Sequence, residues 1–445
     1  MSEVCVDEPI EPFAYDVGVI GAGAAGLVAA IRAAERGLRV VVLEKNRRPG
    51  VKILMSGGTR CNLTNARGLR NLRVVSGPID PAYDPRQALG ARSIQEAFGA
   101  GGKFLGPALR SFSVEQSVRL FEDEGVVTKV EGNGKIFPLS DRATDVLRAL
   151  LQRLERTSAS LRCGSPVVGV IPKGPDGFVV EVANQAPLSC RRVIMTLGGQ
   201  SFPGCGTTGD GYDLARRLGH TILETKPALV PIRVAEEWVT NLKGIAIPDT
   251  LARVQYQTDQ TLMERREAVL FAHFGLSGPA ILDVSRAIAR HSGEPALNLV
   301  LDFLPGEKRE ALDQALQAAC RSGRKPVATL LPSVLPRRLA ESILESAQIP
   351  SNRMGPDLSR IERQRLLNGL KAQRLTITGT LGFAKAEVTS GGVVLEEVTP
   401  ETLESRHQPG LYFAGEILDL DGRIGGYNFQ GAWSTGWLAG SSVLS

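Results

Sequence analysis

A glycine-rich stretch near the N-terminus has the residue types and spacing that bind a diphosphate group. Its sequence, Gly21-Ala22-Gly23-Ala24-Ala25-Gly26, fits the pattern G-x-G-x-x-G and follows a short apolar run at residues 17–20. In such a stretch the first glycine permits a tight turn, the second lets the backbone approach a pyrophosphate, and the third lets helix and strand pack closely. The free N–H groups that start the next helix then hold the phosphate charge.

The residues around this stretch predict a complete βαβ unit. Residues 24–36 are rich in Ala and Leu, which favours a helix. Gly37 can end that helix with a positive φ, and the apolar residues 38–43 predict a second strand. Glu44 follows about 20 residues after the glycines, where a carboxylate can accept hydrogen bonds from an adenosine ribose. We therefore predict a dinucleotide site, since a glycine-rich turn in an ordinary α/β domain would not explain Glu44.

Length and composition indicate a globular protein of two or three domains. The chain has 445 residues, of which 43% are hydrophobic and 22% charged. A net charge of +5 allows anionic ligands but does not by itself indicate a nucleic-acid binder. No stretch reaches the ~18 consecutive apolar residues of a membrane span, and the acidic N-terminus does not resemble a signal peptide. We expect a cytoplasmic protein with no membrane partner.

The cysteines argue against thiol and zinc chemistry. None of the six forms a C-x-x-C pair or has zinc-site spacing, so we predict free thiols in a reducing compartment and no metal. Flavoprotein disulfide reductases carry a close cysteine pair soon after the first βαβ unit. Only Cys61 lies in that region, which disfavours a dithiol mechanism.

A second glycine-rich loop, residues 56–60, lies directly downstream. Lys52 and Arg60 supply positive charge beside a diphosphate or an electron-rich ring, and Asn62 supplies a compact polar group. The alternative is a solvated loop with a basic rim, but the position after the dinucleotide motif favours a ligand.

Residues 204–209 also fit G-x-G-x-x-G. We interpret them as a chance match, because Pro227 breaks the return strand, and expect residues 207–211 to close over a cofactor or cap the next helix.

Further patterns predict the remaining elements. Residues 126–130 and 135–137 predict a hairpin around Asn133-Gly134, and a helix at 141–153 is predicted to begin after the N-cap Ser140. Residues 227–303 alternate short strands and turns, with His273 as a residue that either reaches a substrate or is a packed core or turn residue. The charge-rich residues 305–374 predict helices with a solvated face.

Near the C-terminus a strand at residues 411–414 is followed by Gly415-Glu416, and Gly425-Gly426-Tyr427-Asn428 leads into a closing helix. The N-terminus of that helix is a second positive dipole end. Such an end can stabilise negative charge on the N1–C2=O edge of a flavin.

Taken together, these segments resemble the BaiN-like family of bacterial flavoproteins, which includes aminoacetone-oxidase-like members. The resemblance covers nearly the whole chain and is most specific in SGGTRCNLTN and in GLYFAGEILDLDGRIGGYNFQGAWSTGWLAG. It implies an FAD cofactor and a two-dinucleotide-binding-type flavin domain split by an insertion. The chain departs from the family at two positions. Leu197 stands where the family usually has Thr, which implies that one hydroxyl contact near FAD is lost. Thr59 stands where the family usually has Gly.

The resemblance also implies roles for matching residues. The glycine motif would meet the pyrophosphate, Glu44 the ribose, and Val167 the adenine through its backbone. The segments around residues 52–62 and 425–428 would line the flavin and its ribityl chain, and Glu416 the ribityl and phosphate side. The predicted cofactor-binding residues are Gly21, Gly23, Ala24, Ala25, Gly26, Glu44, Lys45, Lys52, Ser56, Gly57, Gly58, Arg60, Cys61, Asn62, Val167, Leu197, Gly198, Gly199, Gly415, Glu416, Gly425, Gly426, Tyr427 and Asn428.

We therefore predict an α/β fold, a discontinuous Rossmann-like FAD-binding domain with an inserted β-barrel-like and helical region. The predicted boundaries are 1–202 with 375–445 for the FAD domain, 203–304 for the β-rich insertion and 305–374 for the helical insertion.

The predicted function is an FAD-dependent oxidoreductase that transfers a hydride through flavin N5 on a small organic substrate, with NAD(P)H as a transient donor. Two alternatives stay open. One is an O2-using oxidase of small amines or aminoketones. The other is a flavin-bearing RNA-modifying or RNA-binding protein, suggested by the pI of about 8.9 but disfavoured by scattered basic residues and 5% aromatics. No catalytic acid or base is assigned; His273, Arg60 and Tyr427 are candidates, and the oligomeric state is not predicted.

Overall fold

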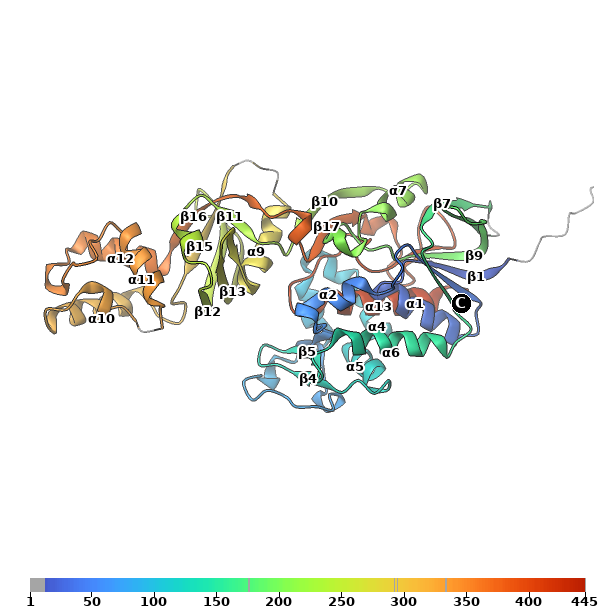
Figure 1. The fold of residues 1–445 in the computed structure, drawn as a ribbon, viewed down its shortest axis with the longest axis horizontal. Coiled ribbons are helices and arrows are strands. Elements are labelled where there is room, and N and C mark those ends of the chain that lie inside the picture. Colours follow the sequence, from blue (N-terminus) through green and yellow to red (C-terminus); the bar gives the residue numbers. More distant parts are fainter. Residues whose placement is uncertain (1–12, 175–176, 292, 294, 333, 445) are drawn as a thin grey trace, which may run out of the picture. The chain divides into compact units, whose positions relative to one another are not determined.

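The chain folds into two compact units. The computed structural model describes residues 13–174, 177–291, 293, 295–332 and 334–444. Unit 1 comprises Met1–Thr225 and Gly391–Ser445, and unit 2 comprises Lys226–Ser390 (Figure 1). The boundary falls within two strands that pair with each other, β10 (Ile222–Ala228) and β17 (Val388–Val393). Within the described residues, none of the helices combines the length and apolar character that crossing a bilayer requires.

Unit 1 is built on a seven-stranded sheet in the order β6-β2-β1-β9-β8-β7, with β18 also paired to β9. The strands β6, β2, β1, β9 and β18 run parallel, so their carboxyl ends meet at one edge. The βαβ unit predicted from the first glycine motif is confirmed. The strands are β1 (Tyr15–Ile20), β2 (Val40–Glu44), β6 (Ser160–Cys163), β7 (Val167–Pro172), β8 (Phe178–Val182), β9 (Leu188–Met195) and β18 (Leu411–Phe413).

Two helices that begin at the carboxyl edge of this sheet pack backbone against backbone. α1 (Ala24–Glu35) follows β1, and α13 (Tyr427–Ser442) is the closing helix of the chain. A Cβ at Gly436 would lie 2.3 Å from the carbonyl oxygen of Ala25, and one at Gly440 would lie 2.4 Å from that of Ala29. Glycine on α13 therefore permits a close approach that a larger side chain would prevent.

A smaller sheet and several helices complete unit 1. The predicted hairpin is confirmed, since β4 and β5 pair antiparallel and Gly134 has a φ of 83°. The predicted N-cap at Ser140 is wrong, because the next helix begins after Arg142, which makes no side-chain cap. The remaining elements are α2 (Val51–Thr59), β3 (Thr64–Asn65), α3 (Ala91–Ala97), α4 (Gly106–Ser111), α5 (Val114–Glu122), β4 (Thr128–Val130), β5 (Lys135–Pro138), α6 (Ala143–Glu155) and α7 (Asp210–Arg217).

The second G-x-G-x-x-G stretch does not start another βαβ unit. Gly209 is the N-cap of α7, and the strand that follows α7 is β10, which pairs with β17 instead of joining the parallel sheet. The interpretation of residues 204–209 as a chance match is therefore confirmed, but the reason given for it is wrong, because Pro227 lies within β10 and does not break it.

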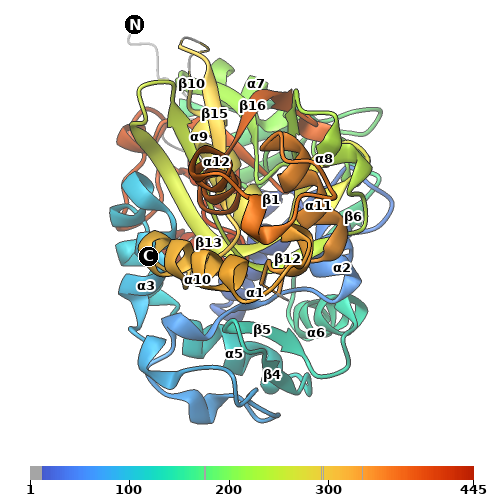
Figure 2. The ribbon, with the colours of Figure 1, turned by 90° about the vertical axis from the view of Figure 1, so that its left-hand side faces the viewer.

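Unit 2 contains a closed barrel in the order β11-β14-β13-β12-β15-β16 and a group of helices that share its hydrophobic core. Figures 1 and 2 show α10, α11 and α12 gathered at one end of the barrel. The predicted fold class, a Rossmann-type domain with an inserted barrel-like and helical region, is confirmed. The elements are β11 (Ile232–Val234), α8 (Trp238–Asn241), β12 (Ala246–Tyr256), β13 (Thr261–Ala272), β14 (Gly275–Ser277), α9 (Pro279–Ala289), β15 (Leu297–Asp302), α10 (Arg309–Arg321), α11 (Arg337–Ser346), α12 (Arg360–Lys371) and β16 (Gln373–Thr380).

Candidate functional site

The glycine motif has the geometry of a diphosphate cradle. A Cβ at Gly21 would lie 2.7 Å from the carbonyl oxygen of Thr196, and one at Gly26 would lie 1.9 Å from that of Gly21. A Cβ at Gly23 would meet no atom within 4 Å. The first and third glycines are thus required by packing, whereas the second faces open space at the N-terminus of α1, where an anion is favoured.

Glu44 is buried at the end of β2 and retains acceptor capacity. Its Oε2 accepts a hydrogen bond from the backbone N–H of Ala22 at 2.8 Å, and its Oε1 accepts one from that of Asn46 at 2.8 Å. A carboxylate oxygen can accept more than one hydrogen bond, so ribose hydroxyls can still donate to it. The neighbouring Lys45 Nζ donates to Thr208 Oγ1 at 2.7 Å and pairs with Asp210.

The segment predicted as a glycine-rich loop begins as helix α2 and then leaves helical geometry. Ser56 has a ψ of 150°, and Gly57 and Gly58 have φ values of 55° and 68°. A Cβ at Gly58 would meet nothing within 4 Å. Cys61 also has a positive φ, 60°, and is fully buried. The chain thus exposes backbone at Gly58 and buries the thiol that follows.

Asn62 joins this segment to the N-terminus of α13. With its amide oriented to satisfy the hydrogen-bond network, its nitrogen donates to the carbonyl oxygens of Ile136 and Thr64, and its oxygen accepts from the N–H of Gly426 at 2.9 Å. Gly426 has a φ of 91°, and a Cβ there would lie 2.4 Å from the carbonyl oxygen of Thr64. Glycine is therefore needed where the two segments meet.

A triangle of polar side chains connects three distant parts of the sequence. Lys52 Nζ lies 2.7 Å from Glu416 Oε2 and 2.6 Å from Ser201 Oγ, and Ser201 Oγ donates to Glu416 Oε1 at 2.8 Å. All three side chains are partly or fully buried. The triangle holds α2, the segment after β9 and the segment after β18 together at the carboxyl edge of the sheet.

Arg60 is held by acids and by a ring. Its guanidinium lies 3.9 Å from the centroid of the Phe137 ring and pairs with Glu131 at 2.6 Å and Asp141 at 3.4 Å. Lys129 also pairs with Asp141, at 2.6 Å. The charge of Arg60 is therefore largely compensated inside unit 1.

The C-terminal segment brings Gly415 and the turn before α13 to the same edge. The N–H of Gly415 donates to Thr435 Oγ1 at 3.0 Å, and a Cβ at Gly415 would lie 2.9 Å from that of Ala25. Asn428 closes the turn by accepting from the N–H of Gly422 at 2.8 Å and donating to its carbonyl oxygen at 3.0 Å. Tyr427 is buried.

The other predicted residues lie at or near the sheet. Leu197, Gly198 and Gly199 lie just beyond β9, after Thr196, and Gly198 has a φ of 74°. Val167 is the first residue of β7 and pairs with Val182. His273 is exposed at the turn between β13 and β14 of unit 2, which agrees with the predicted alternative of a turn residue and not with a packed core position.

Sequence reasoning missed two residues that hold this edge. Thr196 Oγ1 donates at 2.9 Å toward the carbonyl oxygens of Ile20 and Gly21, where it fastens β9 to the start of the glycine turn. Ser201 belongs to the triangle described above. Thr196 and Ser201 lie on either side of Leu197-Gly198-Gly199, just after a buried strand. That position was the sequence signal that could have identified them.

A side-chain cluster outside this edge has the proximity of metal ligands. Among the described residues, the ligand atoms of His220, Glu397 and His407 lie within 4.8 Å of one another. However, Ser405 Oγ accepts from two backbone N–H groups, at 3.0 and 2.8 Å, so its hydrogen is left for His220 Nε2 at 2.7 Å. His220 Nδ1–H then donates to Glu397 at 3.1 Å. Both ring nitrogens of His220 thus make hydrogen bonds. We refer to the group of His220, Glu397 and Ser405 as the His220 brace.

The fold and the site define a Rossmann-type dinucleotide-binding protein, and comparisons with known proteins identify the family. The family model described as "HI0933-like protein Rossmann domain" matches residues 15–76 and 88–442. The chain belongs to this HI0933-like family, which confirms the resemblance inferred from the sequence. It is an FAD-dependent oxidoreductase.

Curated relatives match nearly the full length of the chain. A 3-dehydro-bile acid delta(4,6)-reductase of Clostridium scindens is 34% identical, over 96% of this chain and 98% of the relative. A ribosomal RNA dihydrouridine synthase of Escherichia coli is 32% identical, over 97% and 98%. A protein of the same name from Haemophilus influenzae is 30% identical, over 96% and 97%.

Solved structures share the fold at lower identity. A 3-ketosteroid-delta4-(5alpha)-dehydrogenase from Rhodococcus jostii RHA1 has a TM-score of 0.52 and 16% identity, over 98% of both chains. A flavocytochrome c3 fumarate reductase has a TM-score of 0.50 and 15% identity, over 96% of this chain and 78% of that chain.

Residues of unit 1 fit FAD. The open space at Gly23, the remaining acceptor capacity of buried Glu44 and the helix N-termini of α1 and α13 match a diphosphate, a ribose and an electron-rich ring. FAD supplies two-electron chemistry at its N5 atom. The chain supplies the binding, the orientation and the local charge.

Proposed function

We propose that this FAD-dependent oxidoreductase reduces a carbon–carbon double bond conjugated to a carbonyl group, with NAD(P)H as the electron donor. The observation that carries the proposal is the chemistry shared by two full-length relatives with different named substrates. A 3-oxo bile acid with Δ4 and Δ6 double bonds is a conjugated enone. Uridine likewise has a C5–C6 double bond conjugated to the C4 carbonyl, and dihydrouridine carries two more hydrogens across that bond.

Such a reduction places defined demands on the protein. A hydride is added to the carbon β to the carbonyl, a proton is added to the α carbon, and the carbonyl oxygen gains negative charge on the way. Donors that stabilise this charge act best where water is excluded. The predicted cofactor-binding residues at the carboxyl edge of unit 1 would hold the flavin ring at that edge, which supports the proposal.

The burial of most described cysteines is consistent with a nicotinamide electron donor in place of a thiol. The described cysteines, Cys61, Cys163, Cys190, Cys205 and Cys320, are free, and four of the five are buried. Burial raises the pKa of the Cys61 thiol to about 12, since the charged thiolate loses its hydration. Thiols in this state are poor electron carriers, so NAD(P)H, which carries a hydride, is the proposed source.

The proposal is tested by anaerobic titration of the FAD-loaded protein with NADH and NADPH, read at the flavin absorbance band. We expect bleaching, followed by recovery of the band when a 3-oxo-4-ene steroid or another enone is added. A protein that does not bleach with either nucleotide, but bleaches with small amines and forms hydrogen peroxide in air, would contradict the proposal and favour an amine oxidase. A matched control is the saturated ketone, which must not restore the band.

A second candidate, reduction of uridine within RNA, is favoured by a specific observation on charge. The chain has 52 Lys and Arg against 47 Asp and Glu, and residues 226–390 alone hold 22 against 17. The surplus of positive charge therefore lies in unit 2, and two relatives from different organisms bear an RNA-directed name. The test is incubation of unmodified RNA with the reduced protein, followed by nucleoside mass spectrometry for dihydrouridine.

A further inference from the structure

The positive charge of the chain is concentrated in its helical segment. Residues 305–374, which contain α10, α11 and α12, hold 13 Lys and Arg but only 7 Asp and Glu. The other residues of the chain hold 39 Lys and Arg and 40 Asp and Glu, so they are close to neutral. One end of unit 2 thus carries a surplus that the rest of the protein does not share, and such a surplus attracts polyanions.

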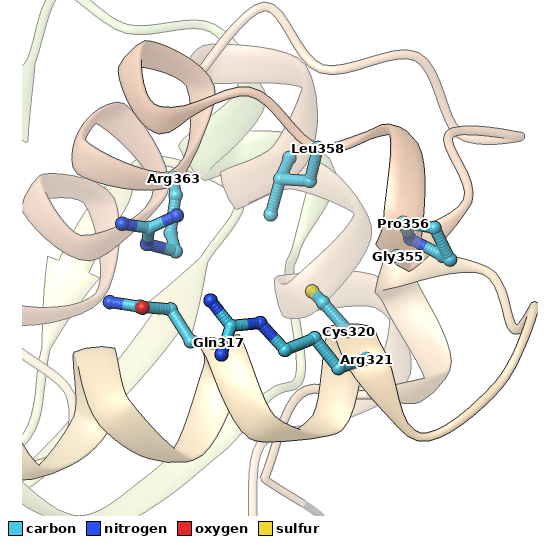
Figure 3. A pocket seen from close by; sticks show the side chains of 7 residues that line it. All are labelled: Gln317, Cys320, Arg321, Gly355, Pro356, Leu358 and Arg363. Carbon is cyan, nitrogen blue, oxygen red and sulfur yellow. The ribbon is translucent and has the colours of Figure 1, made fainter.

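Two arginines of this segment converge on one cavity. The cavity has a volume of about 370 Å³ and is lined by Gln317, Cys320, Arg321, Gly355, Pro356, Leu358 and Arg363. Figure 3 shows the guanidinium groups of Arg321 and Arg363 directed into the same space from α10 and α12, next to the amide of Gln317. Two like charges directed at one cavity repel each other, and an anion between them would remove that repulsion.

Only part of this charge is compensated inside the protein. Arg363 Nε pairs with Asp313 Oδ1 at 2.6 Å, which leaves the rest of its guanidinium toward the cavity. Among the residues that the structure describes, the exposed side chains of Arg321, Lys325 and Arg360 have no ion-pair partner. Three more of the seven acids in the segment are paired with other arginines. These pairs are Arg353–Glu362 at 2.8 Å, Arg337–Glu341 at 2.7 Å and Arg324–Asp357 at 3.8 Å.

The absence of aromatic residues from the segment indicates which kind of anion it would bind. Residues 305–374 contain no Phe, Trp, Tyr or His. Proteins that hold single-stranded bases stack them on aromatic rings, whereas contacts to phosphates need only Arg, Lys and polar groups. The segment is therefore suited to grip a phosphodiester backbone without reading its bases.

We propose that residues 305–374 form a docking surface for the phosphodiester backbone of RNA, centred on the cavity between Arg321 and Arg363. This inference rests on the RNA-directed candidate under the proposed function. The surface contributes affinity and orientation, and base selection lies elsewhere. Arg321, Lys325 and Arg360 make the exposed contacts, and Arg363 holds one phosphate in the cavity.

The test compares the FAD-loaded wild-type chain with a triple variant, Arg321→Gln, Lys325→Gln and Arg360→Gln. Its matched control is a second triple variant in unit 1, Arg73→Gln, Arg86→Gln and Arg92→Gln, which removes the same charge from exposed positions. The probe is a fluorescent RNA hairpin, and anisotropy is measured across a series of KCl concentrations. The logarithm of a protein's affinity for nucleic acid falls linearly with the logarithm of the salt concentration. The slope is proportional to the number of phosphates that the protein neutralises.

We expect the unit 2 variant to bind at least tenfold more weakly at about 0.1 M KCl, with a log–log salt slope smaller in magnitude by about two to three, since each lost phosphate contact removes about 0.7–0.9. The unit 1 variant should bind within about twofold of wild type. Equal binding by wild type and the unit 2 variant would overturn the docking surface. So would binding of inorganic phosphate or anionic lipid vesicles, but not RNA, at the wild-type surface.

A second readout separates this inference from the proposed function. Both triple variants should retain bleaching by NAD(P)H and reduction of small enones, because none of the substituted residues belongs to the predicted cofactor site. Loss of RNA binding with enone reduction intact supports the docking surface. A unit 2 variant that still forms dihydrouridine in RNA at the wild-type rate and affinity would overturn the docking surface while leaving the reductase proposal standing.

Discussion

Lys52 Nζ lies 2.7 Å from Glu416 Oε2, although the two residues are 364 positions apart in the chain. The contact joins α2, near the start of the chain, to the segment after β18, near its end. Ser201 lies against both, at 2.6 Å from Lys52 and 2.8 Å from Glu416. The first and last parts of unit 1 are therefore fastened at the same edge of the sheet, where the glycine motif also lies.

This pair gives a prediction on cofactor affinity. Lys52→Met removes a positive charge beside the proposed FAD diphosphate, whereas Glu416→Gln removes only the countercharge and keeps the shape. We expect Lys52→Met to weaken FAD binding by about 1.5–3 kcal/mol, the usual contribution of a charged hydrogen bond. Glu416→Gln should bind FAD at least as tightly as wild type. Calorimetric titration of the apo-protein with FAD measures both, and equal weakening would show that the pair is structural.

The glycine motif gives a second prediction, on three alanine variants. Gly23 has a φ of −83°, which alanine accepts, and its Cβ would meet open space. Gly23→Ala should fold normally and bind FAD at least tenfold more weakly. Gly26→Ala should fail to give folded protein, since its Cβ would lie 1.9 Å from a carbonyl oxygen. Gly37→Ala is the control: its φ of 85° costs about 1 kcal/mol of stability without an effect on FAD.

Melting temperature and FAD affinity separate the three outcomes. Stability should fall in Gly37→Ala with FAD affinity kept, and FAD affinity should fall in Gly23→Ala with apo-protein stability kept. If Gly23→Ala retains wild-type affinity, the pyrophosphate does not approach this position.

The parts of the fold that the sequence could predict are those set by local pattern. The βαβ unit depends on glycine spacing, an Ala-rich helix and two apolar runs within 30 residues, so its strand, turn and helix could be predicted one after another. The hairpin at Asn133-Gly134 likewise depends on one turn. The convergence of both ends of the chain at one edge was predicted by resemblance to a family, because no local rule places Glu416 beside Lys52.

The barrel could be predicted only in outline. Its closure depends on pairs such as Ile232↔Thr380 and Leu299↔Leu375, which join strands far apart in the sequence. A period of two in apolar residues indicates strands but does not identify their partners or register. For the same reason the exposure of His273 could not be decided, since the nearby phenylalanines are compatible with both a core position and a turn.

Thiol reactivity provides a third prediction. Cys163 is the exposed cysteine among the five described, whereas burial raises the pKa of Cys61 and of Cys190 to about 12. In a Cys5→Ser background, brief treatment with iodoacetamide at pH 8 should alkylate Cys163 first and leave Cys61 and Cys190 unmodified, as peptide mass spectrometry will show. Rapid alkylation of Cys61 in folded protein would contradict the burial of this segment. The substitution Cys163→Ser should remove the fast phase of alkylation.

The brace around His220 gives a fourth prediction, on the pH dependence of stability. Burial lowers the pKa of His220, and the neighbouring His407 lowers it further, while Glu397 acts in the opposite direction. The ring is also packed against Phe413, with the centroids 4.7 Å apart, and it is bound to Ser405. In the folded protein the ring is therefore neutral at a pH where the unfolded chain would bind a proton.

The sign of the effect follows from this difference in proton binding. Where the unfolded state binds more protons than the folded state, the free energy of unfolding rises with pH. The contribution of His220 is thus fully present above its ordinary pKa of about 6.5 and is lost as the pH falls below that value, by at most about 1.4 kcal/mol per pH unit.

Urea denaturation between pH 7.5 and 5 measures this effect. His220→Gln should be less stable at pH 7.5 by about 1–3 kcal/mol, because it breaks buried hydrogen bonds, and its stability should depend less on pH than that of wild type. His273→Gln, a change at an exposed ring in unit 2, is the control and should leave both quantities unchanged. An undiminished pH dependence in His220→Gln would show that other groups, such as the carboxyl of Glu397, carry the acid sensitivity of this region.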